Sequence, residues 1–179
     1  MNEKLLKKLA KIKMIVSDVD GILTDGTIMV SKNHEYKTFH VEDALGTGLL
    51  KLANIPISFI SARESEATTA RLKELRIDHV FQGYVNKLSA LEKILDIYNI
   101  DYKDVLYIGD GFVDMPVMEK VGFSISVPNA HLEVKELADF VTLKSGGMGV
   151  LVEIVQYVLK SKGIYDKVFN KMRKEIYGA

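Results

Sequence analysis

The chain has 179 residues, a length typical of one domain and sufficient to bury about 70% of the surface that the unfolded chain exposes. Its 24 lysines and arginines balance 24 aspartates and glutamates, and a net charge of zero argues against a nucleic-acid or membrane-surface partner. The absence of cysteine excludes disulfide scaffolds, cysteine-ligated metals and a thiol nucleophile. We therefore predict a single domain over residues 1–179 that acts on a small molecule through oxygen and nitrogen groups.

The N-terminal residues 1–13 place five lysines among apolar residues. They lack the unbroken apolar run and the small-residue cleavage site of a signal peptide. They predict a short amphipathic surface helix, and a basic helix lying on a membrane is the alternative. Because no apolar run elsewhere approaches the ~20 residues that cross a bilayer, we expect a cytoplasmic protein.

Short β-branched runs alternate with helical patterns along the rest of the chain. The predicted strands are residues 14–17, 57–60, 105–108, 123–127 and 140–142. The predicted helices are residues 44–53, 64–75, 87–98, 114–120, 150–159 and 165–176. This alternation is typical of an α/β fold with a doubly wound, mostly parallel sheet and helices on both faces.

One segment, residues 27–40, interrupts this alternation. Polar and apolar residues alternate around Ser31 to Glu35, as they do in a β-hairpin. The segment is too short to be a domain, so it predicts a hairpin that projects from the core. Because Ile28, Val30, Tyr36 and Phe39 need a surface to cover them, the hairpin is expected to be a lid or a contact between subunits.

Asp18 and Asp20 follow the first predicted strand, and Gly21 comes directly after them. Two carboxylates at this spacing point the same way if the strand continues, and a glycine lets the backbone turn sharply. Ligands of open α/β sheets bind beyond the carboxyl ends of the strands. The alternative is that these aspartates only begin a turn or cap a helix.

Further polar side chains come at three later places in the chain, all at the same edge of the predicted sheet. Ser61 and Arg63 come after the second strand, Lys87 begins a helix, and Asp110 and Asp114 follow the strand at 105–108. Each could be a cap or a solvated charge, but all are unlikely to meet there by chance. Together they predict a phosphoryl-transfer site.

The chemistry of such a site needs these residue types. Carboxylates are hard oxygen ligands for Mg²⁺, and Ser61 and Lys87 would hold phosphoryl oxygens and offset their charge. One aspartate can attack phosphorus to form an acyl-phosphate. Its neighbour can protonate the leaving oxygen and later activate water.

The order of these groups resembles the four motifs of the haloacid dehalogenase (HAD) superfamily of phosphatases, and most of the chain resembles one branch, the 3-deoxy-D-manno-octulosonate 8-phosphate (KDO 8-phosphate) phosphatases. The resemblance is carried by residues 18–26, 39–41 with 43, 77–79, 82–83, 86–88, 107–110, 115–118, 129–131 and 146–147. It implies hydrolysis of KDO 8-phosphate in lipopolysaccharide precursor synthesis.

By this resemblance, Asp18 is the nucleophile and Asp20 is the acid/base. It implies that Mg²⁺ is bound by Asp18, the backbone carbonyl of Asp20 and Asp110, and that Asp114 lies behind these ligands or orients Lys87. Ser61 and Lys87 are implied to act in catalysis and to bind the phosphate, and Arg63 is expected to bind the substrate. The family also implies a cap-less homotetramer, in which hairpins from four subunits form a barrel and each C-terminal region helps to close a neighbour's site.

The chain departs from the branch at several positions. Ser61 stands where threonine is usual and is followed by Ala62 in place of glycine, while Gly111 stands where a third aspartate is common. Glu42 replaces a commonly basic residue and Met148 replaces an expected arginine. The last two changes remove cations near the expected path of an acidic sugar.

Three alternatives remain. Phosphatases of nine-carbon keto acid 9-phosphates share the motifs but carry an acidic residue where this chain has Arg63, so a cation there favours KDO 8-phosphate. A phospho-receiver domain combines similar groups, but its lysine follows the acceptor aspartate in the chain, whereas Lys87 precedes Asp110. A catalytically inactive HAD domain kept for assembly is disfavoured by the intact motifs. For Arg63 itself, the alternative to substrate binding is an ion pair with Glu64 or Glu66.

Overall fold

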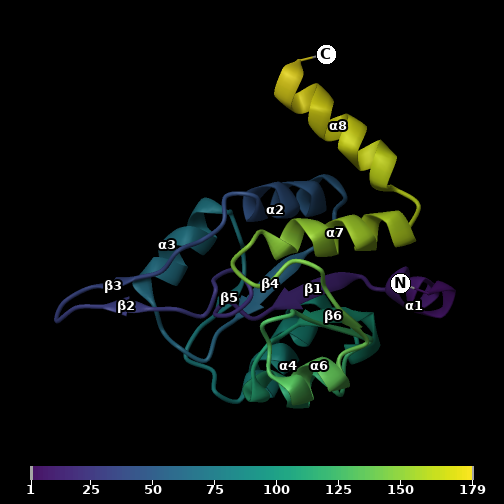
Figure 1. Cartoon of the computed structure of the whole chain (residues 1–179). Helices are drawn as coiled ribbons and strands as arrows, with labels where there is room; N and C mark the ends of the chain where they lie inside the picture. The colour runs from purple at the N-terminus through teal and green to yellow at the C-terminus, as the bar shows by residue number, and fades with distance from the viewer. Residues whose placement is uncertain (1, 179) are drawn as a thin grey trace.

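A computed structural model describes residues 2–178, and its centre is a six-stranded sheet (Figure 1). The strands are β1 (Met14–Ser17), β4 (Ile57–Ile60), β5 (Val80–Phe81), β6 (Val105–Ile108), β7 (Phe123–Ser126) and β8 (Phe140–Val141). They lie in the order β5-β4-β1-β6-β7-β8, and every neighbouring pair is parallel. The predicted α/β fold with a doubly wound parallel sheet is confirmed.

Helices cover both faces of this sheet (Figure 1). One core lies under α2 (Asp43–Leu52), α3 (Glu66–Glu74), α7 (Val150–Ser161) and α8 (Tyr165–Tyr177), with α1 (Glu3–Leu9) at its edge. The second core lies under α4 (Lys87–Tyr98), α5 (Met115–Met118) and α6 (Leu132–Leu137). Strand β1 serves both, because Ile15 belongs to the first core and Met14 and Val16 belong to the second.

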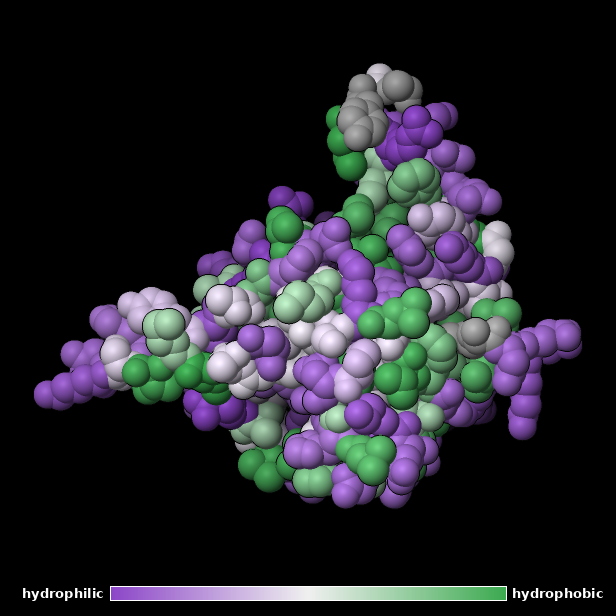
Figure 2. Space-filling model, in the orientation of Figure 1, coloured by the Kyte–Doolittle hydropathy of each residue, from purple (hydrophilic) through white to green (hydrophobic). Residues whose placement is uncertain are grey.

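The segment between β1 and α2 contains the predicted hairpin. Its strands β2 (Met29–Val30) and β3 (Glu35–Tyr36) are antiparallel and shorter than the predicted 27–40. The hairpin projects from the body of the molecule (Figure 1), and apolar residues lie along it (Figure 2). Met29, Val30 and Tyr36 are exposed, whereas Phe39 packs against the first core and so does not need a partner to cover it.

Several element boundaries differ from the sequence-based prediction. The helix expected at 64–75 begins at Glu66, because Ser65 has an extended backbone and its side chain caps Thr68. The helix expected at 114–120 is a 3₁₀ turn, η2 (Phe112–Asp114), followed by α5. Strand β5, helix α6 and the 3₁₀ turn η1 (Tyr102–Asp104) were not predicted, since elements this short carry little periodicity. Among the described residues, no helix combines the length and apolar character needed to cross a membrane.

The buried side chain of Asp43, the first residue of α2, contacts the backbone near the start of α7. Its side chain is 1% exposed, and one oxygen accepts a hydrogen bond from the Leu151 N–H at 3.3 Å. The other oxygen has no partner among the described residues. Burial raises the pKa of Asp43 to about 6.

This raised pKa predicts a pH-dependent contribution to stability. The folded state holds the proton more tightly than the unfolded chain, so stability falls as pH rises from about 4 to about 6, by roughly 3 kcal/mol for this group. In urea unfolding between pH 4 and pH 7, with chelator present, Asp43→Asn should remove that part of the slope. The same substitution at exposed Asp96 is the control, and equal slopes in wild type and Asp43→Asn would contradict the assignment.

Candidate active site

The predicted site residues meet at one edge of the sheet. Asp18, Ser61 and Gly109 directly follow β1, β4 and β6, and Lys87 is the first residue of α4. Because neighbouring strands are parallel, their carboxyl ends share that edge. Residues far apart in the chain therefore line one place.

The centre of this site is an ion-pair cluster. The Lys87 Nζ lies 2.8 Å from Asp18 Oδ2 and 2.7 Å from Asp114 Oδ1. All three residues are buried: Lys87 is 1% exposed, Asp18 6% and Asp114 0%. An ammonium placed between two carboxylates in such surroundings interacts strongly with both.

Asp114 is held by four donors. Its Oδ1 accepts hydrogen bonds from Lys87 and from the Tyr107 hydroxyl, at 2.7 and 2.6 Å. Its Oδ2 accepts from the backbone N–H groups of Asp110 and Gly111, at 3.1 and 2.9 Å. These bonds curl the chain after β6 into the 3₁₀ turn and leave Asp114 as a fixed partner for Lys87.

The cluster shifts the pKa values of its members. Burial alone would lower the pKa of Lys87, but the Asp18 and Asp114 carboxylates outweigh it and hold the pKa above its ordinary value. Burial, with repulsion from Asp114, raises the pKa of Asp18 well above its ordinary value. The same two causes raise the pKa of Asp110 to about 6. Three carboxylates face one ammonium, so the site carries an excess of negative charge.

That excess fits a divalent cation. Oxygens of Asp18, Asp110 and Asp114 lie within 4.8 Å of one another. The set contains only carboxylates, which suit hard cations such as Mg²⁺. Each oxygen of Asp114 already accepts two hydrogen bonds. Asp18 and Asp110 are therefore the side chains left to hold a metal.

Gly21 allows this close packing. Its φ of +89° lies in the region that favours glycine, and a Cβ at this position would overlap the Asp110 carboxylate. The turn after Asp20 therefore passes directly against the third carboxylate. The glycine expected for a sharp turn also provides room for the site.

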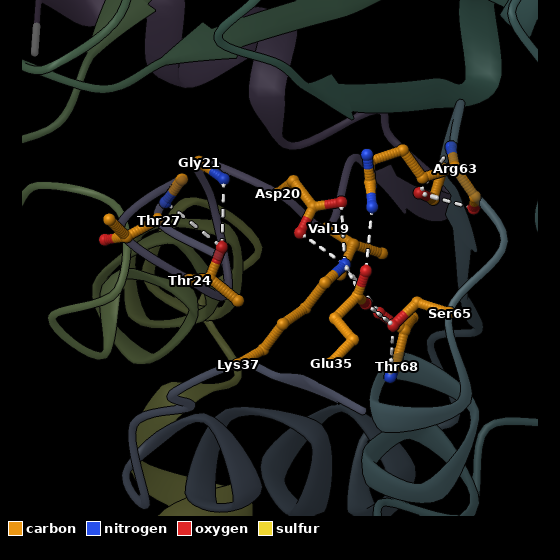
Figure 3. Close-up of polar contacts among 12 residues, drawn as sticks. Val19, Asp20, Gly21, Thr24, Thr27, Glu35, Lys37, Arg63, Ser65 and Thr68 are labelled. Carbon is orange, nitrogen blue, oxygen red and sulfur yellow. Dashed lines mark hydrogen bonds and ion pairs between the residues drawn. The ribbon is translucent and has the colours of Figure 1, made fainter. Parts of the chain in front are cut away.

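Asp20 lies beside a residue that the sequence analysis missed, Lys37. The Lys37 Nζ donates to both Asp20 oxygens, at 2.7 and 2.9 Å (Figure 3). Glu35, two residues earlier, accepts hydrogen bonds from Arg63 at 2.7 Å and from the Ser65 hydroxyl at 2.6 Å (Figure 3). No motif in the sequence marks either residue, because their contacts depend on the path of the hairpin in space.

Ser61 and Arg63 form a tight turn after β4. The Ser61 hydroxyl donates to the Arg63 carbonyl at 3.0 Å and accepts from the Arg63 N–H at 3.2 Å. The Arg63 side chain is 53% exposed. This side chain does form an ion pair, as the alternative to substrate binding expected, but the partner is Glu35 of the hairpin and not Glu64 or Glu66.

The acidic departure at Glu42 is matched by a cation. Glu42 pairs with Lys144 at 2.6 Å, and the Lys144 side chain comes from the loop before α7. Met148, in the same loop, is 56% exposed. The negative charge of Glu42 is therefore offset locally.

Known proteins resemble this chain in sequence and structure. A family model described as haloacid dehalogenase-like hydrolase matches residues 51–154. The 3-deoxy-D-manno-octulosonate 8-phosphate phosphatase KdsC of Salmonella typhi is 37% identical over 164 residues, which cover 91% of this chain and 87% of that protein.

Two solved structures have the same fold. The KDO 8-phosphate phosphatase of Moraxella catarrhalis, in complex with magnesium ion, phosphate ion and KDO, has a TM-score of 0.92 at 35% identity, covering 96% of this chain and 99% of that one. The cobalt-bound enzyme of Haemophilus influenzae has a TM-score of 0.86 at 33% identity, covering 90% and 98%. With the site geometry and these matches together, the chain belongs to the haloacid dehalogenase-like hydrolases.

Proposed function

We propose that this protein is a Mg²⁺-dependent phosphatase that hydrolyses KDO 8-phosphate to KDO and phosphate. The observation that carries the proposal is the buried cluster. In it, Lys87 pairs with Asp18 and Asp114, and oxygens of Asp18, Asp110 and Asp114 lie within 4.8 Å of one another. The relative bound to magnesium, phosphate and KDO supports the choice of metal and substrate.

In the first chemical step, an Asp18 oxygen attacks phosphorus and the bond between phosphorus and the sugar oxygen breaks. Asp20 donates a proton to that oxygen, so the sugar leaves as an alcohol. Lys87, fixed by Asp114, and Ser61, after rotation of its hydroxyl, bind the phosphoryl oxygens. The product of this step is an acyl-phosphate on Asp18.

In the second step, water attacks phosphorus and releases inorganic phosphate from Asp18. Asp20, now ionised, accepts the proton from that water. Asp18, Asp110 and the Asp20 backbone carbonyl would hold Mg²⁺, which would supply positive charge to offset the charge of the phosphoryl group. Both carboxylates return to their starting states.

The decisive experiment is a panel of phosphate esters assayed for phosphate release. KDO 8-phosphate should have the highest kcat/KM, above a nine-carbon keto acid 9-phosphate, a neutral hexose 6-phosphate and p-nitrophenyl phosphate. A preference for the nine-carbon ester would replace the substrate but keep the reaction. No release from any ester would overturn the proposed function.

We predict that Arg63 recognises the acidic end of the substrate. Arg63→Ala should lower kcat/KM for KDO 8-phosphate by about 10- to 100-fold, as expected for loss of one charge-assisted hydrogen bond worth roughly 1.5–3 kcal/mol. Release from p-nitrophenyl phosphate, which has no carboxylate, should be nearly unchanged. Equal losses on both substrates would instead mean that Arg63, through Glu35 or Ser61, supports the phosphate site.

We also propose that the protein is a homotetramer in which the hairpins meet. Met29 and Val30 are 72% and 70% exposed, and burying such apolar side chains between subunits is favourable. Light scattering at micromolar concentration should give four times the mass of one chain. Val30→Asp should shift the protein to smaller species, and a monomer in the wild type would contradict the proposal.

A further inference from the structure

Lys37 is a buried cation on an otherwise exposed hairpin. Lys37 directly follows β3. The last residue of that strand, Tyr36, is 57% exposed, yet the Lys37 side chain is 0% exposed. It points from the hairpin into the edge of the sheet, toward Asp20 (Figure 3). Removing an ammonium from water is costly unless it is well paired.

The surroundings of Lys37 satisfy its whole donor capacity. An ammonium has three N–H donors, and the Lys37 Nζ meets three acceptors: both oxygens of Asp20, and Thr68 Oγ1 at 3.1 Å. Thr68 is fully buried at the start of α3. Glu35 adds a fourth oxygen at 3.9 Å, beyond hydrogen-bond distance.

This arrangement fixes the Asp20 carboxylate from two separate elements. The hairpin supplies the cation, and α3 supplies the hydroxyl that holds the cation in place. Replacing a buried ion pair by apolar groups is often neutral for stability, so stability alone gives little reason to build this pair. A defined orientation of Asp20 gives such a reason, because proton transfer requires the donor to lie within about 2.6–3.2 Å of the reacting oxygen.

We propose that Lys37 is a positioning residue for Asp20: by contacting both oxygens of the Asp20 side chain, it sets the orientation in which the protonated carboxyl group donates to the leaving oxygen of the substrate and the ionised group then accepts a proton from water. This inference rests on the proposed phosphatase function. Lys37 itself exchanges no proton with the substrate. The projecting hairpin thereby contributes to the chemistry of its own subunit.

The leaving group provides the test. A sugar alkoxide is strongly basic and needs protonation as it leaves, whereas p-nitrophenolate leaves readily without it. Because kcat/KM reports the steps up to departure of the leaving group, a displaced Asp20 should affect the two substrates differently. A general loss of structure would affect both equally.

The variant is Lys37→Met, which keeps the length of the side chain and removes its charge and donors. We expect it to lower kcat/KM for KDO 8-phosphate by about 100-fold and for p-nitrophenyl phosphate by less than about 5-fold. Lys32→Met, at an exposed position of the same hairpin, is the matched control and should leave both values unchanged. Lys37→Arg, which restores charge and donors, should recover part of the loss on KDO 8-phosphate.

Equal losses on both substrates, or no loss on either, would overturn the role of Lys37 while leaving the phosphatase function intact. If wild type hydrolyses neither substrate, the proposed function fails and this inference fails with it. If Lys37→Met does not fold, Thr68→Val decides, because it removes one acceptor of Lys37 and keeps the lysine. A smaller loss confined to KDO 8-phosphate supports the proposal, and an unselective effect contradicts it.

Discussion

Asp18→Asn is expected to abolish phosphate release, lowering kcat by at least about 10⁴-fold, because an amide oxygen cannot replace the carboxylate as nucleophile. The loss should be the same for KDO 8-phosphate and p-nitrophenyl phosphate, since both must react with Asp18. Steady-state phosphate release measures it. Asp20→Asn should be nearly as severe on the sugar phosphate but can still trap phosphate on Asp18.

The same variant has an expected effect on stability. Burial raises the pKa of Asp18, so its ionised form destabilises the metal-free fold. Without metal, Asp18→Asn should therefore be as stable as wild type or more stable, in urea unfolding at pH 7. Wild-type turnover by this variant would contradict the covalent mechanism.

Lys87→Met is expected to damage both stability and activity. It leaves Asp18 and Asp114 buried without their cation, and breaking a buried pair in this way costs about 3–5 kcal/mol. Loss of the ammonium that binds the phosphoryl group should lower kcat by about 10³-fold or more. Urea unfolding and phosphate release at pH 7 measure the two effects.

The matched control for Lys87→Met is Lys93→Met, on the same helix but exposed. It should change stability by less than about 0.5 kcal/mol, as surface substitutions usually do. Both variants should lose activity, but only Lys87→Met should lose stability. This difference separates the effect of the cluster's charges on folding from their role in catalysis. If Lys87→Met were as stable as wild type, the ion-pair cluster would not be a stabilising feature of the fold.

The fold was largely predictable because most strands of the six-stranded sheet are fully buried runs of four residues, separated by helices with regular apolar spacing. The strands at 14–17, 57–60 and 105–108 have the predicted bounds. Strand β5 has only two residues, and no pattern distinguishes two residues from a loop. The late start of α3 could not be read from apolar spacing, because it depends on the side-chain cap made by Ser65.

The site was predictable where its residues directly follow strands or begin a helix. Asp18, Ser61 and Lys87 do so, and Asp110 comes two residues after β6. Lys37 was missed because its contact with Asp20 depends on the path of the hairpin in space, not on a motif in the chain.

Tyr107 was missed for a different reason. It lies in β6 and belongs to the second core, so it reads as a core residue. Its hydroxyl nevertheless donates to Asp114. A buried tyrosine generally needs such a partner, but the sequence does not say which one it has.

The proposed activity should be measured as phosphate release from KDO 8-phosphate by the full chain, with Mg²⁺ and after treatment with a chelator. We expect a kcat/KM of about 10⁴ M⁻¹s⁻¹ or more with Mg²⁺, near-complete loss with the chelator and recovery when Mg²⁺ is restored. Asp18→Asn prepared in the same way is the blank for contaminating phosphatases. Undiminished release in the chelator, or release from Asp18→Asn equal to wild type, would mean that the protein is not a Mg²⁺-dependent phosphatase acting through Asp18.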